Sequence, residues 1–347
     1  MKITFVAAGN GFGHLKRVCT VISQIFQSAP ETTVYLIGAT AHLGVLERWG
    51  ITQVFSKYSF EFINGSTEHN LMASHRSDYK VDTYQRSCSI ISGLIKFTDP
   101  DKIISDNLVG VLYDHPETIL MGSFLFQDTL AHRGPELDLI CNWEVELLKK
   151  YRPKMLGLTD MVMPGVLDKT DFVGLPWFCD RKGYSDEKLF LVSEKKQLLI
   201  TGGGTPGVTE KLLDIIRVLY RQKEFVIHLD SSLYNLVAKH QKKMVTHFPF
   251  TDQAFQALDW IICRPGIGIL TDAVQFGVPV CTVYEADLEM QHNASCAHAL
   301  GWGLDINDYT PDQLIQVFNR DTAPLKKSMM RLETGGAHKA AHYILNR

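Results

Sequence analysis

The sequence predicts an α/β protein with two doubly wound domains, each a parallel sheet covered by helices. Three observations support this prediction. Short apolar runs alternate with longer stretches of helical periodicity, the alternation pauses and restarts in the middle of the chain, and glycine-rich turns follow several of the apolar runs. The length of 347 residues also exceeds what one hydrophobic core usually serves.

The first half of the chain predicts strands and helices in alternation. Apolar runs predict the strands, and apolar residues at every third or fourth position predict the helices. The expected strands are 2–8, 32–39, 52–58, 102–106 and 117–124, and the expected helices are 15–27 and 41–50. The polar segment from about 57 to 85 has no clean period, so it predicts a long loop or a loose helix near the substrate.

The second half restarts the pattern after the stretch 174–186, whose Gly, Pro and charged residues predict a domain junction. The expected strands are 197–204, 225–230, 245–250, 260–266 and 279–285, and the expected helix is 208–222. We therefore expect one domain at 1–175 and a second at 176–325. The tail 326–347 predicts a pair of helices broken at Gly335 and Gly336, and we expect the terminal helix around Ala340 to pack back on the first domain.

Composition excludes several classes of protein. The formal net charge of -3 and the scattered basic residues disfavour a nucleic-acid partner. The seven cysteines lack zinc-knuckle spacing and predict reduced thiols in a cytoplasm. No apolar stretch reaches the roughly 20 residues that span a membrane. We expect a cytoplasmic protein whose membrane contact, if any, is peripheral at the inner face.

The segment 9–17, GNGFGHLKR, joins the first expected strand to the first expected helix. Unpaired N–H groups and the dipole at a helix start attract anions. The spacing of Gly9, Gly11 and Gly13 departs from the dinucleotide fingerprint, which disfavours a nicotinamide cofactor. A helix start also disfavours a protonated imidazole, so His14 is available as a neutral general base. The plain alternative is that His14 only caps the helix.

A second glycine-rich segment, TGGGTPG at 201–207, opens the expected helix of the second domain. Backbone N–H groups of Gly203, Gly204 and Thr205 are placed to hold a phosphate. The Gly-Lys-Ser/Thr ending of a P-loop is missing, so this is not an ATP-type loop. A plain turn is the alternative.

The third segment, 263–303, carries the most information. A strand ends at Arg264, a Pro-Gly pair starts a helix, and that helix stops at a glycine before the next strand. Asp272, near the first turns of that helix, is placed to accept hydrogen bonds from ribose hydroxyls. Glu289 is expected in the loop after the next strand, ahead of a helix that opens near Asn293, where its carboxylate would bind sugar hydroxyls.

Residues 263–303 resemble the donor-binding segment of GT-B glycosyltransferases. The most similar branch, family 28-like, contains the peptidoglycan enzyme that adds N-acetylglucosamine to a lipid-linked muramyl peptide. The matching positions are Arg264, Gly266, Asp272, Gly277, Pro279, Asn293 and Ala294. Segment 9–17 resembles the Gly-x-Gly-His loop of the first GT-B domain, and 201–207 resembles the phosphate loop of the second. The ordered set spans nearly the whole chain.

The resemblance implies two Rossmann-like domains that face each other across a cleft, with the acceptor on the first and a nucleotide sugar on the second. Glu289 and Met290 stand where many relatives carry Asp-Gln or Gln-Gln for sugar hydroxyls, and a thioether does not replace those hydrogen bonds. The substrate-binding residues it implies are Gly11, Gly13, Gly203, Gly204, Thr205, Arg264, Gly266, Ile267, Gly268, Asp272, Glu289, Met290 and Asn293.

By the same resemblance, His14 takes a proton from the acceptor hydroxyl as that hydroxyl attacks the anomeric carbon. Either Asp106 or Asp128 orients His14, and the spacing does not choose between them. Helix dipoles and N–H groups stabilise the departing diphosphate, so no metal is required. The one Asp-x-Asp, at 99–101, is centred on proline and predicts a turn.

The sequence therefore predicts an inverting, metal-independent glycosyltransferase with a nucleotide diphosphate sugar as co-substrate and no other cofactor. UDP is the expected nucleotide by its prevalence in the family. The acceptor is expected to be a hydroxyl of a glycan or glycolipid precursor or of a small metabolite. Three alternatives stay open: a nucleotide-sugar hydrolase of the same fold, a catalytically silent sugar-nucleotide-binding subunit, and an epimerase. The oligomeric state does not follow from the sequence.

Overall fold

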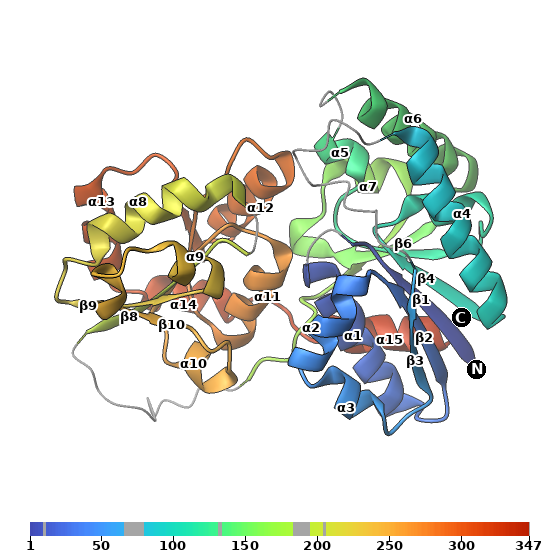
Figure 1. Cartoon of the computed structure of the whole chain (residues 1–347), viewed down its shortest axis with the longest axis horizontal. Coiled ribbons are helices and arrows are strands. Elements are labelled where there is room, and N and C mark those ends of the chain that lie inside the picture. The colour runs from blue at the N-terminus through green and yellow to red at the C-terminus, as the bar shows by residue number, and fades with distance from the viewer. Residues whose placement is uncertain (10–11, 66–79, 131–133, 183–194, 204–205, 347) are drawn as a thin grey trace. The chain divides into compact units, whose positions relative to one another are not determined.

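The computed structural model describes residues 1–9, 12–65, 80–130, 134–182, 195–203 and 206–346. Contacts within the chain divide it into two compact units, which Figure 1 shows in colours that run along the sequence. The first unit comprises Met1–Phe178 together with Gly335–Arg347, and the second comprises Cys179–Thr334. Each unit has its own sheet and its own core, so each is described by itself.

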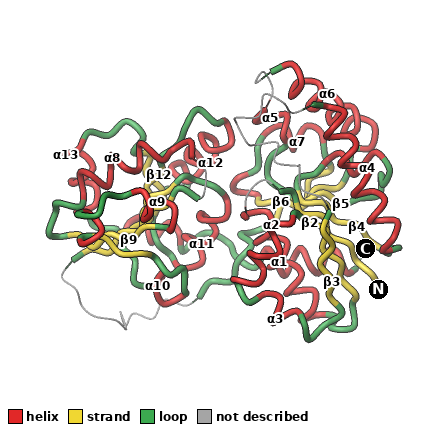
Figure 2. The backbone as a smooth tube through the Cα atoms, in the orientation of Figure 1, coloured by secondary structure: helices red, strands yellow, loops and turns green. Residues whose placement is uncertain are grey.

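The first unit is built on a seven-stranded sheet whose strand pairs are all parallel. Figure 2 shows the strands in yellow. The order is β3-β2-β1-β4-β5-β6-β7. The strands are β1 (Lys2–Ala7), β2 (Thr33–Gly38), β3 (Phe60–Asn64), β4 (Lys102–Asp106), β5 (Ile119–Met121), β6 (Lys154–Leu158) and β7 (Asp171–Leu175). The order reverses between β1 and β4, and doubly wound sheets bind ligands at the carboxyl ends of such a pair.

Helices cover both faces of this sheet, with α4 and α6 on one face and α1 and α15 on the other (Figure 1). The helices are α1 (Phe12–Ser28), α2 (Thr40–Arg48), α3 (Ile51–Phe55), α4 (Val81–Thr98), α5 (Phe126–Leu130), α6 (Pro135–Tyr151), α7 (Pro164–Lys169) and α15 (Gly336–Leu345), with 3-10 turns at Val109–Tyr113 and Thr159–Met161. On the α4 and α6 face, Tyr84, Ile91 and Ile140 are buried against the sheet. Such burial stabilises each apolar side chain by roughly 2 kcal/mol.

The second unit is built on a six-stranded parallel sheet in the order β10-β9-β8-β11-β12-β13. The strands are β8 (Lys196–Thr201), β9 (Phe225–Leu229), β10 (Val245–His247), β11 (Trp260–Cys263), β12 (Val280–Thr282) and β13 (Gly303–Asp305). Here the order reverses between β8 and β11. The central strand β11 is buried along its whole length, as expected for a parallel strand covered on both faces.

The second unit's helices begin and end at recognisable sequence signals. They are α8 (Thr209–Leu219), α9 (Ser231–Leu236), α10 (Asp252–Gln256), α11 (Ile267–Phe276), α12 (Leu288–Ala299), α13 (Pro311–Asn319) and α14 (Ala323–Met329), with 3-10 turns at Pro206–Val208 and Gln241–Lys243. Asp230 caps α9 by accepting from the backbone N–H of Leu233, and Gly277 ends α11 in the left-handed region at a φ of 64°. No described helix has the length and apolar character that a membrane span requires.

The expected fold class is confirmed, since both sheets are parallel and doubly wound. The expected strand at 52–58 is wrong, because Ile51–Phe55 forms α3 instead. Gly50, at a φ of 68°, starts that helix, and the ring of Phe55 packs on Phe26. The segment 57–85, expected to be a loop or a loose helix, contains β3 and the start of α4, while its residues 66–79 lie outside the described part.

The tail contains two helices, as expected, with α14 in the second unit and α15 in the first. The helix α15 packs against α1, and its buried residues are mostly small: Gly336, Ala337, Ala340 and Ala341, together with Ile344. The backbone N–H of Gly336 donates to the carbonyl of Trp177 at 2.8 Å. A Cβ at Gly336 would stand 2.1 Å from the carbonyl oxygen of Pro176, so only glycine allows this approach.

Candidate active site

The first unit brings His14 and Asp106 together at its switch point. Asp106 is the last residue of β4 and pairs in register with Ala7, the last residue of the neighbouring β1. His14 is the third residue of α1, which follows β1. Its Nδ1 lies 2.6 Å from Oδ1 of Asp106. Asp106 is 0% exposed and His14 is 9% exposed, so the hydrogen bond is shielded from water.

Arg17 joins this pair from the same helix. Its Nε donates to Oδ2 of Asp106 at 2.8 Å, and its Nη2 donates to Oδ1 at 2.7 Å. The same Nη2 lies 3.5 Å from Nδ1 of His14. Sequence reasoning missed Arg17, although the signal was present: residues three apart share one helix face, so Arg17 and His14 point the same way.

The electrostatics of the cluster fix its protonation. Burial by itself raises the pKa of Asp106, but the Arg17 guanidinium and then His14 more than offset this and hold that pKa below its ordinary value. An ionised carboxylate only accepts hydrogen bonds, so Nδ1 of His14 is the donor in this contact. In the neutral ring with that tautomer, Nε2 carries the lone pair. Within the described part of the chain no hydrogen bond reaches that Nε2. The arrangement can therefore accept a proton from a hydroxyl group.

His42, on α2, is a second histidine beside the cluster that sequence reasoning missed. It is 1% exposed, and its Nδ1 accepts from the backbone N–H of Ala39 at 3.2 Å. Burial, and then the nearby His14, lower the pKa of His42 to about 4. His42 is therefore neutral at physiological pH, and it adds no positive charge to the site.

The second candidate carboxylate, Asp128, has other partners. It lies in α5, where its Oδ2 accepts from the backbone N–H of Leu125 at 3.2 Å. Its Oδ1 lies 2.0 Å from where a Cβ on Gly165 would stand, so the side chain packs tightly over that glycine. Burial raises its pKa. Of the two alternatives, the structure therefore brings Asp106 to His14.

The glycines of segment 9–17 are only partly described. Gly9 follows β1, and Gly13 lies exposed in the first turn of α1, one residue before His14. Gly11 lies outside the described residues. The helix start places backbone N–H groups at the carboxyl edge of the sheet, where an anion is favoured.

The loop after β8, expected to hold a phosphate, has two of its N–H groups engaged within the protein. Gly202 donates to Oδ2 of Asp230 at 2.9 Å, and Gly203 donates to Oγ1 of Thr201 at 3.3 Å. Gly203 has a φ of 66°, which glycine adopts without strain. Gly204 and Thr205 lie outside the described residues. A phosphate would have to displace the Thr201 hydroxyl to bind the N–H of Gly203.

Arg264, at the end of β11, pairs with a carboxylate from the next loop. Its Nε and its Nη2 each lie 2.8 Å from Oε1 of Glu285, and Nη2 lies 3.8 Å from Oδ2 of Asp287. Glu285 in turn packs on Gly207, whose Cβ, if present, would stand 3.1 Å from its Cδ. The loops after β8, β11 and β12 therefore meet at one edge of the second sheet. Glu285 was not among the residues chosen from the sequence.

The residues around the start of α11 occupy the same edge. Gly266 is the N-cap residue of α11, and Ile267 and Gly268 form its first turn. Asp272 lies one turn further along and is partly exposed. The start of a ten-residue helix at the switch point provides backbone N–H groups and a dipole that favour an anion.

Three further predicted binding residues, Glu289, Met290 and Asn293, lie inside α12, which begins at Leu288 rather than near Asn293. The expected loop around Glu289 is wrong because Asp287 starts the helix earlier, its Oδ1 accepting from the backbone N–H of Met290 at 3.2 Å. The three residues are 8%, 1% and 1% exposed in that order. Asn293 donates through Nδ2 to the carbonyl of Pro265 at 3.0 Å, so it braces the loop that precedes α11.

No family model and no curated protein matches this chain. Solved structures do match it. The glycotransferase of kitacinnamycin aligns with a TM-score of 0.67 at 14% identity, over 99% of this chain and 98% of that one. The chain has the GT-B fold. Glycosyltransferase VinC in complex with dTDP aligns at a TM-score of 0.62 and 12% identity, over 99% of this chain and 98% of that one.

MurG of Acinetobacter baumannii aligns over 100% of this chain and 99% of its own, with a TM-score of 0.62 at 13% identity. At such identities the likeness establishes the fold and leaves the chemistry to the residues. The expectation of two Rossmann-like domains, drawn from the resemblance to this branch, is confirmed by these neighbours and by the two sheets.

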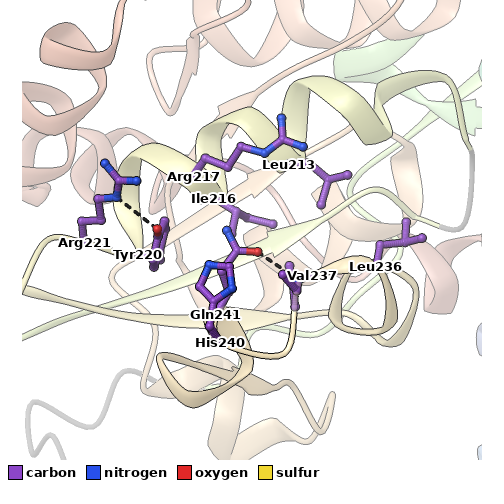
Figure 3. A pocket seen from close by; sticks show the side chains of 10 residues that line it. Leu213, Ile216, Arg217, Tyr220, Arg221, Leu236, Val237, His240 and Gln241 are labelled. Atoms are coloured by element: carbon purple, nitrogen blue, oxygen red, sulfur yellow. Dashed lines mark hydrogen bonds between the residues drawn. The ribbon is translucent and has the colours of Figure 1, made fainter.

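A cavity of about 380 Å³ lies in the second unit, and none of the predicted site residues lines it (Figure 3). It is bounded by α8 and the two residues after it, and by residues 236–238, 240 and 241. Its arginines already have partners: Arg217 pairs with Asp214, and Nε of Arg221 donates to the hydroxyl of Tyr220 at 3.0 Å. Among the described residues, no group of three or more His, Cys, Asp or Glu is placed to hold a metal ion.

Proposed function

We propose that this chain is a glycosyltransferase that moves a sugar from a nucleotide diphosphate sugar to a hydroxyl acceptor, with inversion at the anomeric carbon. The observation that carries the proposal is the buried hydrogen bond of 2.6 Å between His14 and Asp106 at the switch point of the first sheet. It supplies an oriented base, and the fold is one that known glycosyltransferases share.

The chemistry follows from the tautomer of His14. Nε2 accepts the proton of the acceptor hydroxyl while the hydroxyl oxygen forms a bond to the anomeric carbon. The bond from that carbon to the diphosphate oxygen breaks, and its electron pair leaves with the nucleotide diphosphate. Asp106 stabilises the imidazolium that forms, as carboxylates do in other His–Asp pairs. A single displacement inverts the anomeric configuration, and no metal or further cofactor is part of the proposal.

The donor is proposed to bind at the carboxyl edge of the second sheet. Asp272 accepts hydrogen bonds from the ribose, and the helix starts at 206–208 and 267–268 face the diphosphate. UDP is the proposed nucleotide. The competing one is dTDP, which a structural neighbour binds. Glu289 and Met290 are 8% and 1% exposed, so little of either side chain is open to a sugar hydroxyl.

The proposed acceptor is a hydroxyl of a glycan or glycolipid precursor or of a small metabolite. The structural neighbours include one protein linked by name to kitacinnamycin and one MurG, so both classes belong in a screen. A cytoplasmic location is proposed, with peripheral contact at the inner membrane face for a lipid-linked acceptor.

The first test is a thermal-shift panel with UDP, GDP, dTDP, CMP and their sugar conjugates, because a ligand that binds the folded state raises the melting temperature. Nucleotide release is then measured with candidate acceptors. His14→Ala is expected to lower kcat by about 10² to 10⁴, the usual contribution of a general base. His338→Ala, which removes an exposed histidine from α15, is the matched control.

Three outcomes would overturn the proposal. An unchanged turnover in His14→Ala protein would show that His14 is not the base. A product with retained configuration would exclude single displacement. Release of free sugar at full rate without any acceptor would instead identify the protein as a nucleotide-sugar hydrolase.

A further inference from the structure

The carboxylate that orients His14 has two cationic neighbours rather than one. Both oxygens of Asp106 accept from Arg17, at 2.8 Å and 2.7 Å, and Oδ1 also receives His14 at 2.6 Å. Arg17 is 9% exposed and Asp106 is 0% exposed, so this ion pair is not a surface contact screened by water. A guanidinium is charged at every physiological pH, and its planar fork fixes the plane of a carboxylate.

A His–Asp pair without a further cation has a disadvantage, because a general base must be unprotonated before the reaction begins. The negative carboxylate favours the imidazolium form and so holds a proton on the ring before the acceptor arrives. In this protein Arg17 balances that charge, and its Nη2 lies only 3.5 Å from Nδ1 of His14. A like charge at that distance opposes protonation of the ring.

We propose that Arg17 is a positioning residue of the active site with two effects: it holds Oδ1 of Asp106 against Nδ1 of His14, and its positive charge offsets the charge of that carboxylate beside the ring. The proposal rests on the proposed function only where it calls His14 the base. The geometric part concerns Arg17, Asp106 and His14 alone.

The other groups around the cluster do not substitute for Arg17. Among the described residues, His42 from α2 is a titratable group outside the cluster that interacts electrostatically with His14 and Asp106. His42 is neutral, so it cannot balance the carboxylate. The helix α15, which packs on α1, buries Ala337, Ala340 and Ala341 rather than charged side chains. Arg17 is thus the permanent positive charge in direct contact with Asp106 among the described residues.

The kinetic test compares Arg17→Gln with the wild type between pH 5 and 9. Without the guanidinium, Asp106 acts on His14 alone, so the ring holds its proton to higher pH. The acidic limb of the kcat/KM profile is expected to move up by about one pH unit. kcat at neutral pH is expected to fall by about tenfold or more, with the Kd for the nucleotide unchanged. Arg48→Gln, at an exposed arginine on α2, is the matched control.

Arg17→Lys separates the effect of the positive charge from the effect of the planar guanidinium. It also provides a second test if the Arg17→Gln protein folds poorly. A lysine keeps the charge but loses the two parallel hydrogen bonds. Its acidic limb is expected at the wild-type position while kcat stays several-fold low. A uniform loss of rate in Arg17→Gln, with the limb unmoved, would show a merely structural role and overturn the proposal. So would a wild-type kcat in Arg17→Lys, because the fork would then be dispensable.

A measurement without turnover keeps this proposal separate from the proposed function. NMR titration of the His14 ring in the free protein is expected to show protonation at higher pH in Arg17→Gln than in the wild type. The same titration in both proteins would overturn the proposal even if the protein transfers sugar. Conversely, absence of any transferase activity in the wild type would sink the proposed function while the titration still decides the role of Arg17.

Discussion

Glu144 is a carboxyl group buried in the core between α4, α6 and the first sheet. It is 0% exposed, and the hydroxyl of Tyr84 donates to its Oε1 at 2.5 Å. Its Oε2 is also buried, and no described residue forms a hydrogen bond with it. Burial raises the pKa of Glu144 from 4.5 to about 8. The folded protein therefore keeps this group protonated at neutral pH, whereas the unfolded chain ionises it.

This difference makes stability depend on pH in one direction. Because the pKa is higher in the folded state, folding retains a proton. The stability that Glu144 contributes to the folded state by binding this proton is fully present below pH 4.5 and is lost as pH rises through 8. Across that window each pH unit costs about 1.4 kcal/mol for one proton. Between pH 5 and pH 8, Glu144 should thus lower the free energy of unfolding by about 4 kcal/mol.

Glu144→Gln removes the ionisation and keeps a carbonyl oxygen for Tyr84. The variant is expected to match the wild type at pH 5 within about 1 kcal/mol and to be more stable at pH 8 by about 4 kcal/mol. Urea unfolding at several pH values measures the difference, and hydrogen exchange of α6 amides assigns it to the first unit. Glu146→Gln, two residues along the same helix at an exposed side chain, is the control. Equal pH slopes in wild type and Glu144→Gln would refute the reasoning.

Three other substitutions test individual contacts in the two units. Gly336→Ala places a Cβ 2.1 Å from the carbonyl oxygen of Pro176, so thermal unfolding should show a loss of about 1–3 kcal/mol. Asn293→Ala leaves the buried carbonyl of Pro265 unpaired and should cost about 1–3 kcal/mol in urea unfolding. Asp230→Ala removes the cap of α9 and the hydrogen-bond acceptor of the Gly202 N–H. Because that hydrogen bond shapes the loop after β8, calorimetric titration should show weaker nucleotide binding. Unchanged affinity would mean that the hydrogen bond does not shape the loop.

Much of the fold could be predicted because parallel strands leave a strong sequence signal. Strands buried on both faces appear as short apolar runs, as in WIIC of β11, and their helices have a clear apolar face. The positions of the glycine-rich segments could also be predicted from the sequence, because a turn that follows a parallel strand lies at the carboxyl edge of its sheet. The short elements α3 and β3 were assigned wrongly because pattern alone does not distinguish a five-residue strand from a helical turn.

The partner of His14 could not be predicted, for a physical reason. Asp106 ends one strand of the first sheet and Asp128 follows another, and the sequence does not say which strand lies beside β1. The choice depends on the pairing of β1 with β4, which sets Asp106 opposite Ala7 and 92 residues from His14 in sequence. Arg17 needed no such long-range information, only attention to the helix period.

The donor side shows a different limit of sequence reasoning. A run of glycines after a strand indicates how many backbone N–H groups a loop has for binding a phosphate. It does not show which of them already form hydrogen bonds within the protein. Here Asp230, 28 residues away in sequence, accepts from Gly202, and Thr201 accepts from Gly203. These two N–H groups are therefore already hydrogen-bonded within the protein. We expect the N–H groups at the start of α11 to bind more of the diphosphate as a result. The motif gives the location of the site, and the contacts around it decide how many donors remain.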